Sequence, residues 1–219
     1  MTRRYETLFR TTLWIGVVLL IITMFVSTFF RVNDLANFFR TGILPSKNSI
    51  EFGYANNPAL TLVHILPGII FLILGALQFI KPFRNRYLKW HRLLGKIYII
   101  LGLVVGITAI IMGLRIKFGG YTESAAVIVF GFYFLYGLIN AYRHIKNRRY
   151  NKHREWMIRA FSIGIAVATM RPIIGMFFAF TEIPFNQFFG IVFWIAFILH
   201  ALVAELWIRF TRKKIVVRI

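Results

Sequence analysis

Six long apolar runs constrain this chain more than any other feature of its sequence. A helix needs roughly 20 predominantly apolar residues to cross the ~30 Å hydrocarbon layer of a bilayer. Each run reaches that length or comes within a few residues of it. The runs span residues 8–30, 60–80, 93–114, 124–141, 157–180 and 188–208. The sequence therefore predicts an all-α, polytopic membrane protein with six transmembrane helices.

The composition agrees with an exterior that faces lipid. Apolar residues make up 58% of the chain and charged residues 16%, so the chain is more apolar and less charged than a typical soluble domain. It contains no cysteine, which excludes disulfides, iron–sulfur clusters and thiol catalysis.

The basic residues predict how the chain is oriented in the membrane. Most of the 27 Lys and Arg residues fall in alternate connections between the runs and at the two chain ends. Because cytoplasmic segments are rich in Lys and Arg, we expect both termini to lie in the cytoplasm. The net charge of +20 then reflects this bias and attraction to anionic lipid headgroups rather than nucleic-acid binding.

We expect a single integral membrane domain over residues 1–219, with an outer loop over 31–57 that is rich in turn formers. Short connections predict an antiparallel bundle. The segments 75–92 and 137–154 both contain Arg-Tyr, then Lys, then His-Arg before the next run. This repetition indicates a duplicated hairpin, with a four-helix core formed by spans two to five.

His91 and His153 are the matching histidines of this repetition, and they enter spans three and five at the same side of the membrane. In a four-helix bundle those spans lie diagonally, so two facing imidazoles could ligate a haem b iron. Arg92 and Arg159 could then pair the haem propionates. The alternative is that both histidines only contact water or lipid phosphate.

A second candidate site lies in the outer half of the membrane, where ionisable residues are costly. His64 lies about one turn into span two, and Arg171 lies in span five before Pro172. Together they could form a polar ligand pocket for a quinone headgroup, a haem propionate or a lipid phosphate. The alternative is a structural clamp between two helices. Because carboxylate pairs at membrane depth are lacking, a transporter is disfavoured.

Several separated motifs carry a family resemblance, in this order: His64-Ile-Leu-Pro-Gly, Gly75-Ala-Leu-Gln-Phe, His91-Arg-Leu-Leu-Gly-Lys-Ile-Tyr, His153-Arg-Glu-Trp-Met-Ile-Arg and Thr169-Met-Arg. They resemble the bacterial membrane family catalogued as domain of unknown function 2306, over roughly residues 58–175. At the level of fold the chain is similar to cytochrome b561 and ferric-reductase-like haem bundles. That similarity implies a cross-bundle pair at His91 and His153, and half of a second pair at His64.

Two functional hypotheses follow. The first is a haem b electron-transfer protein of a bacterial inner membrane, exchanging electrons with a quinone pool or a redox partner protein. The second is a cofactor-free membrane protein that binds a lipid or another amphiphile, or that scaffolds a partner complex. The sequence does not decide whether the protein is an enzyme.

Overall fold

The structure, a computed structural model, describes residues 3–47 and 49–212 and holds eight helices and no strand within them. The helices are α1 (Arg3–Thr41), α2 (Ile50–Asn56), α3 (Pro58–Phe79), α4 (Lys81–Arg86), α5 (Leu88–Arg115), α6 (Gly120–Lys146), α7 (Tyr150–Phe180) and α8 (Phe185–Thr211). All but α2 and α4 are long and apolar enough to cross a membrane. The predicted all-α polytopic fold with six spanning helices is confirmed.

The segment between the first two spans differs from the predicted loop over 31–57. Helix α1 continues to Thr41, and α2 occupies seven residues of the remainder, so the irregular backbone described between α1 and α3 is limited to residues 42–47, Ser49 and Asn57. Gly42 ends α1 because its φ of +69° suits glycine, and its N–H donates to the Phe38 carbonyl. Ser49 caps α2 by accepting a hydrogen bond from the Phe52 N–H at 3.4 Å.

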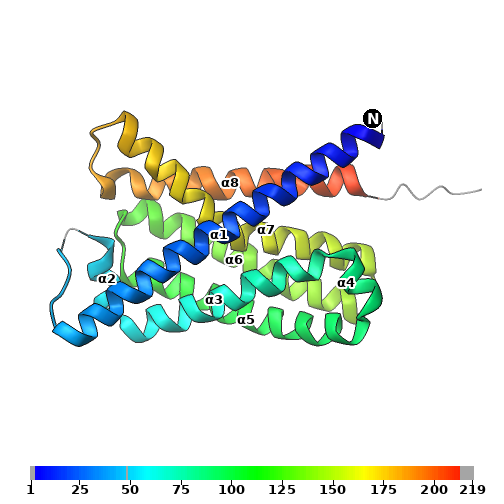
Figure 1. The fold of residues 1–219 in the computed structure, drawn as a ribbon, viewed down its shortest axis with the longest axis horizontal. Helices are drawn as coiled ribbons and strands as arrows, with labels where there is room; N and C mark the ends of the chain where they lie inside the picture. Colours follow the sequence, from blue (N-terminus) through cyan, green and yellow to red (C-terminus); the bar gives the residue numbers. More distant parts are fainter. Residues whose placement is uncertain (1–2, 48, 213–219) are drawn as a thin grey trace, which may run out of the picture.

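Successive spanning helices run in alternating directions between two ends of the molecule (Figure 1). We name each end by the short helix that lies there, the α2 end and the α4 end. Helix α3 packs on α5, α5 on α6, α6 on α7, and α7 back on α3. Among the described residues α5 and α7 share no comparable contact, so they lie diagonally, as predicted for spans three and five. Helix α8 packs outside this core, against α6 and α7.

Aromatic rings that pack against glycines fill the centre of the four-helix core. The rings of Phe71 and Tyr98 stack with their centroids 4.4 Å apart, and both side chains are almost completely buried. A Cβ atom on Gly75 would lie 2.5 Å from the Phe161 ring and 2.8 Å from the Tyr98 ring. A Cβ atom on Gly102 would lie 3.0 Å from the Phe71 ring. Small residues thus let the rings and the helices approach closely.

Helix α1 is peripheral and crosses α3 and α7 obliquely (Figure 1). Near its start the ring of Phe9 lies 5.8 Å from that of Trp207 on α8. One stripe of α1 packs against the core through Val17, Leu20, Ile21 and Met24. Apart from Leu35, which is also buried, much of its apolar surface is exposed, as expected for a helix that faces lipid.

Candidate functional site

The structure places both predicted haem histidines in the first turns of their helices, at the α4 end. The Nδ1–H of His153 is assigned as donor to the Ala141 carbonyl of α6, at 2.8 Å, which leaves its Nε2 with the lone pair. His91 has a buried Nδ1 without a hydrogen-bond partner. The two rings are close enough to interact electrostatically. The structure therefore brings this predicted pair to the same end of diagonal helices.

The two arginines predicted to support the pair behave differently from each other. Arg159 forms a bidentate ion pair with Glu205 of α8, with N–O distances of 2.5 and 3.0 Å. Its guanidinium also lies 4.7 Å from the ring of Trp156. Arg92 is exposed. Arg159 is thus engaged in joining α7 to α8 rather than facing the histidines.

The donor atoms suit haem iron, because each histidine presents an imidazole nitrogen of the kind that ligates it. The space beyond them is occupied, however. Tyr98 lies two turns into the core from His91, and Phe161 lies about two turns in from His153. Both rings meet at the Gly75 backbone. A porphyrin between the histidines and the core would therefore require these rings to repack.

The structure gives the two residues of the predicted outer pocket different neighbours. His64 Nδ1 lies 3.0 Å from the Thr108 hydroxyl of α5. Because Thr108 donates its own proton to the Val104 carbonyl at 2.7 Å, His64 is the donor in this contact. His64 therefore joins α3 to α5, whereas Arg171 interacts with groups of α1 and α2.

Arg171 belongs to a group of charged and aromatic side chains at the α2 end. Arg31 of α1 donates to the Glu51 carboxylate of α2 at 2.8 Å and lies 4.1 Å from the Tyr54 ring centroid. Arg171 interacts electrostatically with all three residues, yet its buried Nε has no hydrogen-bond partner. We call Arg31, Glu51, Tyr54 and Arg171 the Arg171 cluster.

The cluster carries more positive than negative charge. Burial raises the pKa of Glu51, but hydrogen bonds from the backbone and from Arg31 outweigh burial and hold this pKa below its usual value. Burial raises the pKa of Tyr54, and the charges of Arg31 and Arg171 oppose that rise. At neutral pH the cluster therefore contains two guanidinium groups, one carboxylate and a neutral phenol.

A small cavity borders the cluster between α1 and α2. Its volume is about 10 Å³, and Arg31, Glu51, Tyr54 and the exposed Asp34 are among the residues that line it. That volume is roughly the size of one water molecule. A larger ligand therefore requires α2 or its flanking residues to shift.

Residues 61–208 match the family described as Predicted membrane protein (DUF2306). The chain belongs to this family. No curated protein and no solved structure matches the chain. The predicted family is thus confirmed, whereas the similarity to cytochrome b561 and ferric-reductase-like bundles stays a prediction.

The DUF2306 segment begins within α3 and ends within α8, so α1 and α2 lie outside it. The Arg171 cluster joins these two parts, since Arg171 belongs to the DUF2306 segment and its three neighbours do not. Sequence reasoning missed those neighbours because they fell in the predicted loop. The one available signal was an uncompensated Arg171 at membrane depth, which implied that a partner had to exist elsewhere.

Proposed function

We propose that this membrane protein binds an acidic amphiphile, with a phosphate or carboxylate head and an apolar tail, at the Arg171 cluster. The observation that carries the proposal is the position of Arg171, a charged residue of a spanning helix. Among the described residues no carboxylate is bonded to it, because Glu51 is bonded to Arg31.

The energetic argument concerns the depth of Arg171. It lies nine residues before Phe180, the last residue of α7, or about 14 Å along the helix axis. A lone charged side chain near the centre of a spanning helix costs about 2.5–3.5 kcal/mol on insertion scales. An anionic headgroup would offset that cost by accepting hydrogen bonds from the guanidinium.

The surroundings of the cluster suit the two parts of an amphiphile. Tyr54 and Arg171 provide donors for the oxygens of an acidic head. Neighbouring turns of α1 and α7 expose apolar side chains to lipid, among them Phe29, Phe30 and Phe178. An acyl tail could therefore lie along α1 or α7 while the head reaches the cluster beneath α2.

We further propose that the α4 end faces the cytoplasm of a bacterial cell, with both termini on that side. The connections at the α4 end are the ones rich in Lys and Arg, which supports this orientation. The Arg171 cluster would then lie on the side of the outer leaflet of the plasma membrane and bind amphiphiles from that leaflet.

Binding of defined probes to the purified full-length chain tests the proposed function. We expect oleate and phosphatidylglycerol to bind more tightly than phosphatidylcholine, measured by native mass spectrometry from detergent. Arg171→Gln should weaken binding of both acidic probes about 10-fold, the equivalent of one charge-assisted hydrogen bond. Glu51→Gln should strengthen it, because Arg31 would lose its competing carboxylate.

The matched control is Arg115→Gln, which removes an exposed arginine at the same end of the bundle. It should leave binding unchanged. If Arg171→Gln does not fold, Arg171→Lys and Glu51→Gln still separate the possibilities, since Lys keeps the charge. Unchanged affinity in a folded Arg171→Gln protein would contradict the proposal and favour a structural clamp.

The redox hypothesis stays a prediction, and an independent measurement checks it. Haem b ligated by His91 and His153 predicts a Soret band that shifts on dithionite reduction, in protein purified from haem-replete cells. His91→Ala and His153→Ala should each remove the band. A colourless, folded protein from those cells would count against haem and leave the Arg171 proposal unaffected.

A further inference from the structure

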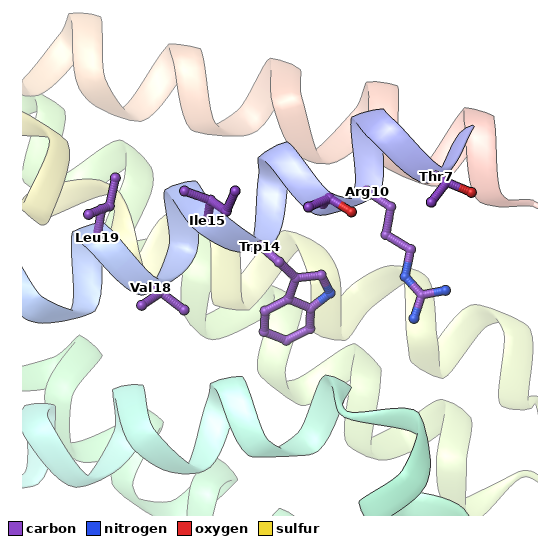
Figure 2. Close-up of a pocket in the computed structure, with 7 residues that line it drawn as sticks. Thr7, Arg10, Trp14, Ile15, Val18 and Leu19 are labelled. Carbon is purple, nitrogen blue, oxygen red and sulfur yellow. The ribbon is translucent and has the colours of Figure 1, made fainter. Parts of the chain in front are cut away.

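We propose that α1 binds one anionic phospholipid of the membrane leaflet at the α4 end, in a groove separate from the Arg171 cluster. The groove has a volume of about 670 Å³ and is open along one side. The described residues that line it all belong to α1, so the groove is an open side of this helix rather than an enclosed cavity. Arg10, Trp14 and Val18 line it and project from the same side of α1 (Figure 2). We call it the α1 groove.

The polarity of the α1 groove changes along the helix as it does along a phospholipid. Thr11 and Arg10 lie toward the start of α1, and Trp14 follows one turn later. Indole rings prefer the headgroup level of a bilayer. Beyond Trp14 the groove is lined by aliphatic side chains alone, Ile15, Val18 and Leu19.

The length of the groove matches a single leaflet. Arg10 and Leu19 are nine residues apart, which corresponds to about 14 Å along the helix. Half of the hydrocarbon layer is about 15 Å thick. With Arg10 at the headgroup level, Leu19 therefore lies near the middle of the membrane, where an acyl chain ends. A partner helix that spans the membrane would need a longer apolar surface.

Charge favours an anionic headgroup over a zwitterionic one. The first ten residues contain Arg3, Arg4 and Arg10 against one acidic residue, Glu6. Arg10 is exposed, and none of the ion pairs among the described side chains involves it. A guanidinium at the headgroup level binds phosphate through several donors at once.

The stripe of α1 that packs on the core leaves the α1 groove open. Val17, Leu20 and Met24 contact the core, while Ile15, Val18 and Leu19 are each at least half exposed. The groove therefore lies beside the packed stripe rather than beneath it. A lipid can enter from the bilayer without any rearrangement of the four-helix core.

Retention of defined lipids by the purified full-length chain tests this site. The protein is equilibrated in detergent with equal amounts of phosphatidylglycerol and phosphatidylcholine, and bound lipid is counted by native mass spectrometry. We expect phosphatidylglycerol to be retained preferentially, and Arg10→Gln to weaken its binding at the α1 groove about 10-fold, so that one bound phosphatidylglycerol fewer is counted while the Arg171 cluster keeps its own. Trp14→Ala should reduce retention of both lipids, because the indole contacts any lipid in the groove.

Two control variants separate this site from other cationic surfaces. Arg209→Gln removes an exposed arginine of α8 at the same end and should leave retention unchanged. The double variant Arg10→Gln, Arg171→Gln should retain less phosphatidylglycerol than Arg10→Gln alone, since the two sites are independent. Full phosphatidylglycerol retention by folded Arg10→Gln protein would overturn the inference. So would a Trp14→Ala variant that turns a dimer into a monomer while lipid retention stays intact, because a second copy would then occupy the groove.

Discussion

Gly190→Val is expected to destabilise the protein by about 3 kcal/mol, the upper end for overpacked sites. Gly190 lies in the second turn of α8, where that helix touches the first turn of α6. A Cβ atom there would lie 2.7 Å from the backbone nitrogen of Glu123 and 2.8 Å from the Thr122 Cβ. A helix backbone cannot yield as a flexible side chain can, so the first turns of α6 and α8 must separate.

The measurement is the free energy of unfolding in mixed detergent and SDS micelles. Gly175→Val is the matched control, because Gly175 lies in a spanning helix and has open space around its Cβ position. It should be neutral or slightly stabilising, since glycine is a poor helix former. Equal stabilities of the two variants would show that α6 and α8 are not in backbone contact.

Glu205→Leu is expected to destabilise the protein by about 2 kcal/mol, because it leaves the Arg159 guanidinium without its carboxylate. Removing one partner of a fully buried ion pair costs about 3–5 kcal/mol. The expected value is lower here because the Glu205 side chain is 39% exposed, although that of Arg159 is only 15% exposed. The double variant Arg159→Met, Glu205→Leu should recover most of the loss, since no unpaired charge remains.

Arg212→Ala provides the comparison, because it breaks a pair at the same end of the bundle in which Arg212 is 62% exposed. Such a pair contributes about 0–1 kcal/mol. The same micelle unfolding assay measures all four proteins. A double variant that is no more stable than Glu205→Leu would contradict the explanation from an unpaired charge.

The sequence predicted the six spanning helices well because the bilayer imposes one simple requirement, a sufficient length of apolar residues. It also predicted that spans three and five lie diagonally, since short connections make successive helices neighbours. The extension of α1 to Thr41 and the helix α2 could not be predicted in this way. Both contain polar residues, and they are held by contacts between Arg31, Glu51 and Tyr54 that are distant in sequence.

The candidate site was predicted only in part, for a similar reason. Arg171 was recognisable because a charged residue in an apolar run is conspicuous. The predicted pairing of Arg171 with His64 shows no hydrogen bond among the described residues, and the partner of a membrane histidine depends on how each helix is rotated about its axis. His64 faces Thr108, a hydroxyl already bonded within its own helix. Hydropathy and charge contain no information about that rotation.

The position of Arg171 late in the chain has a consequence for biosynthesis. Ribosomes deliver a protein from its N-terminus, so α1 and α2 are complete before α7 is translated. Glu51 and Tyr54 are therefore already present when the helix with the costly guanidinium enters the bilayer. Because of this order of synthesis, polar neighbours for Arg171 are already available when α7 enters the lipid.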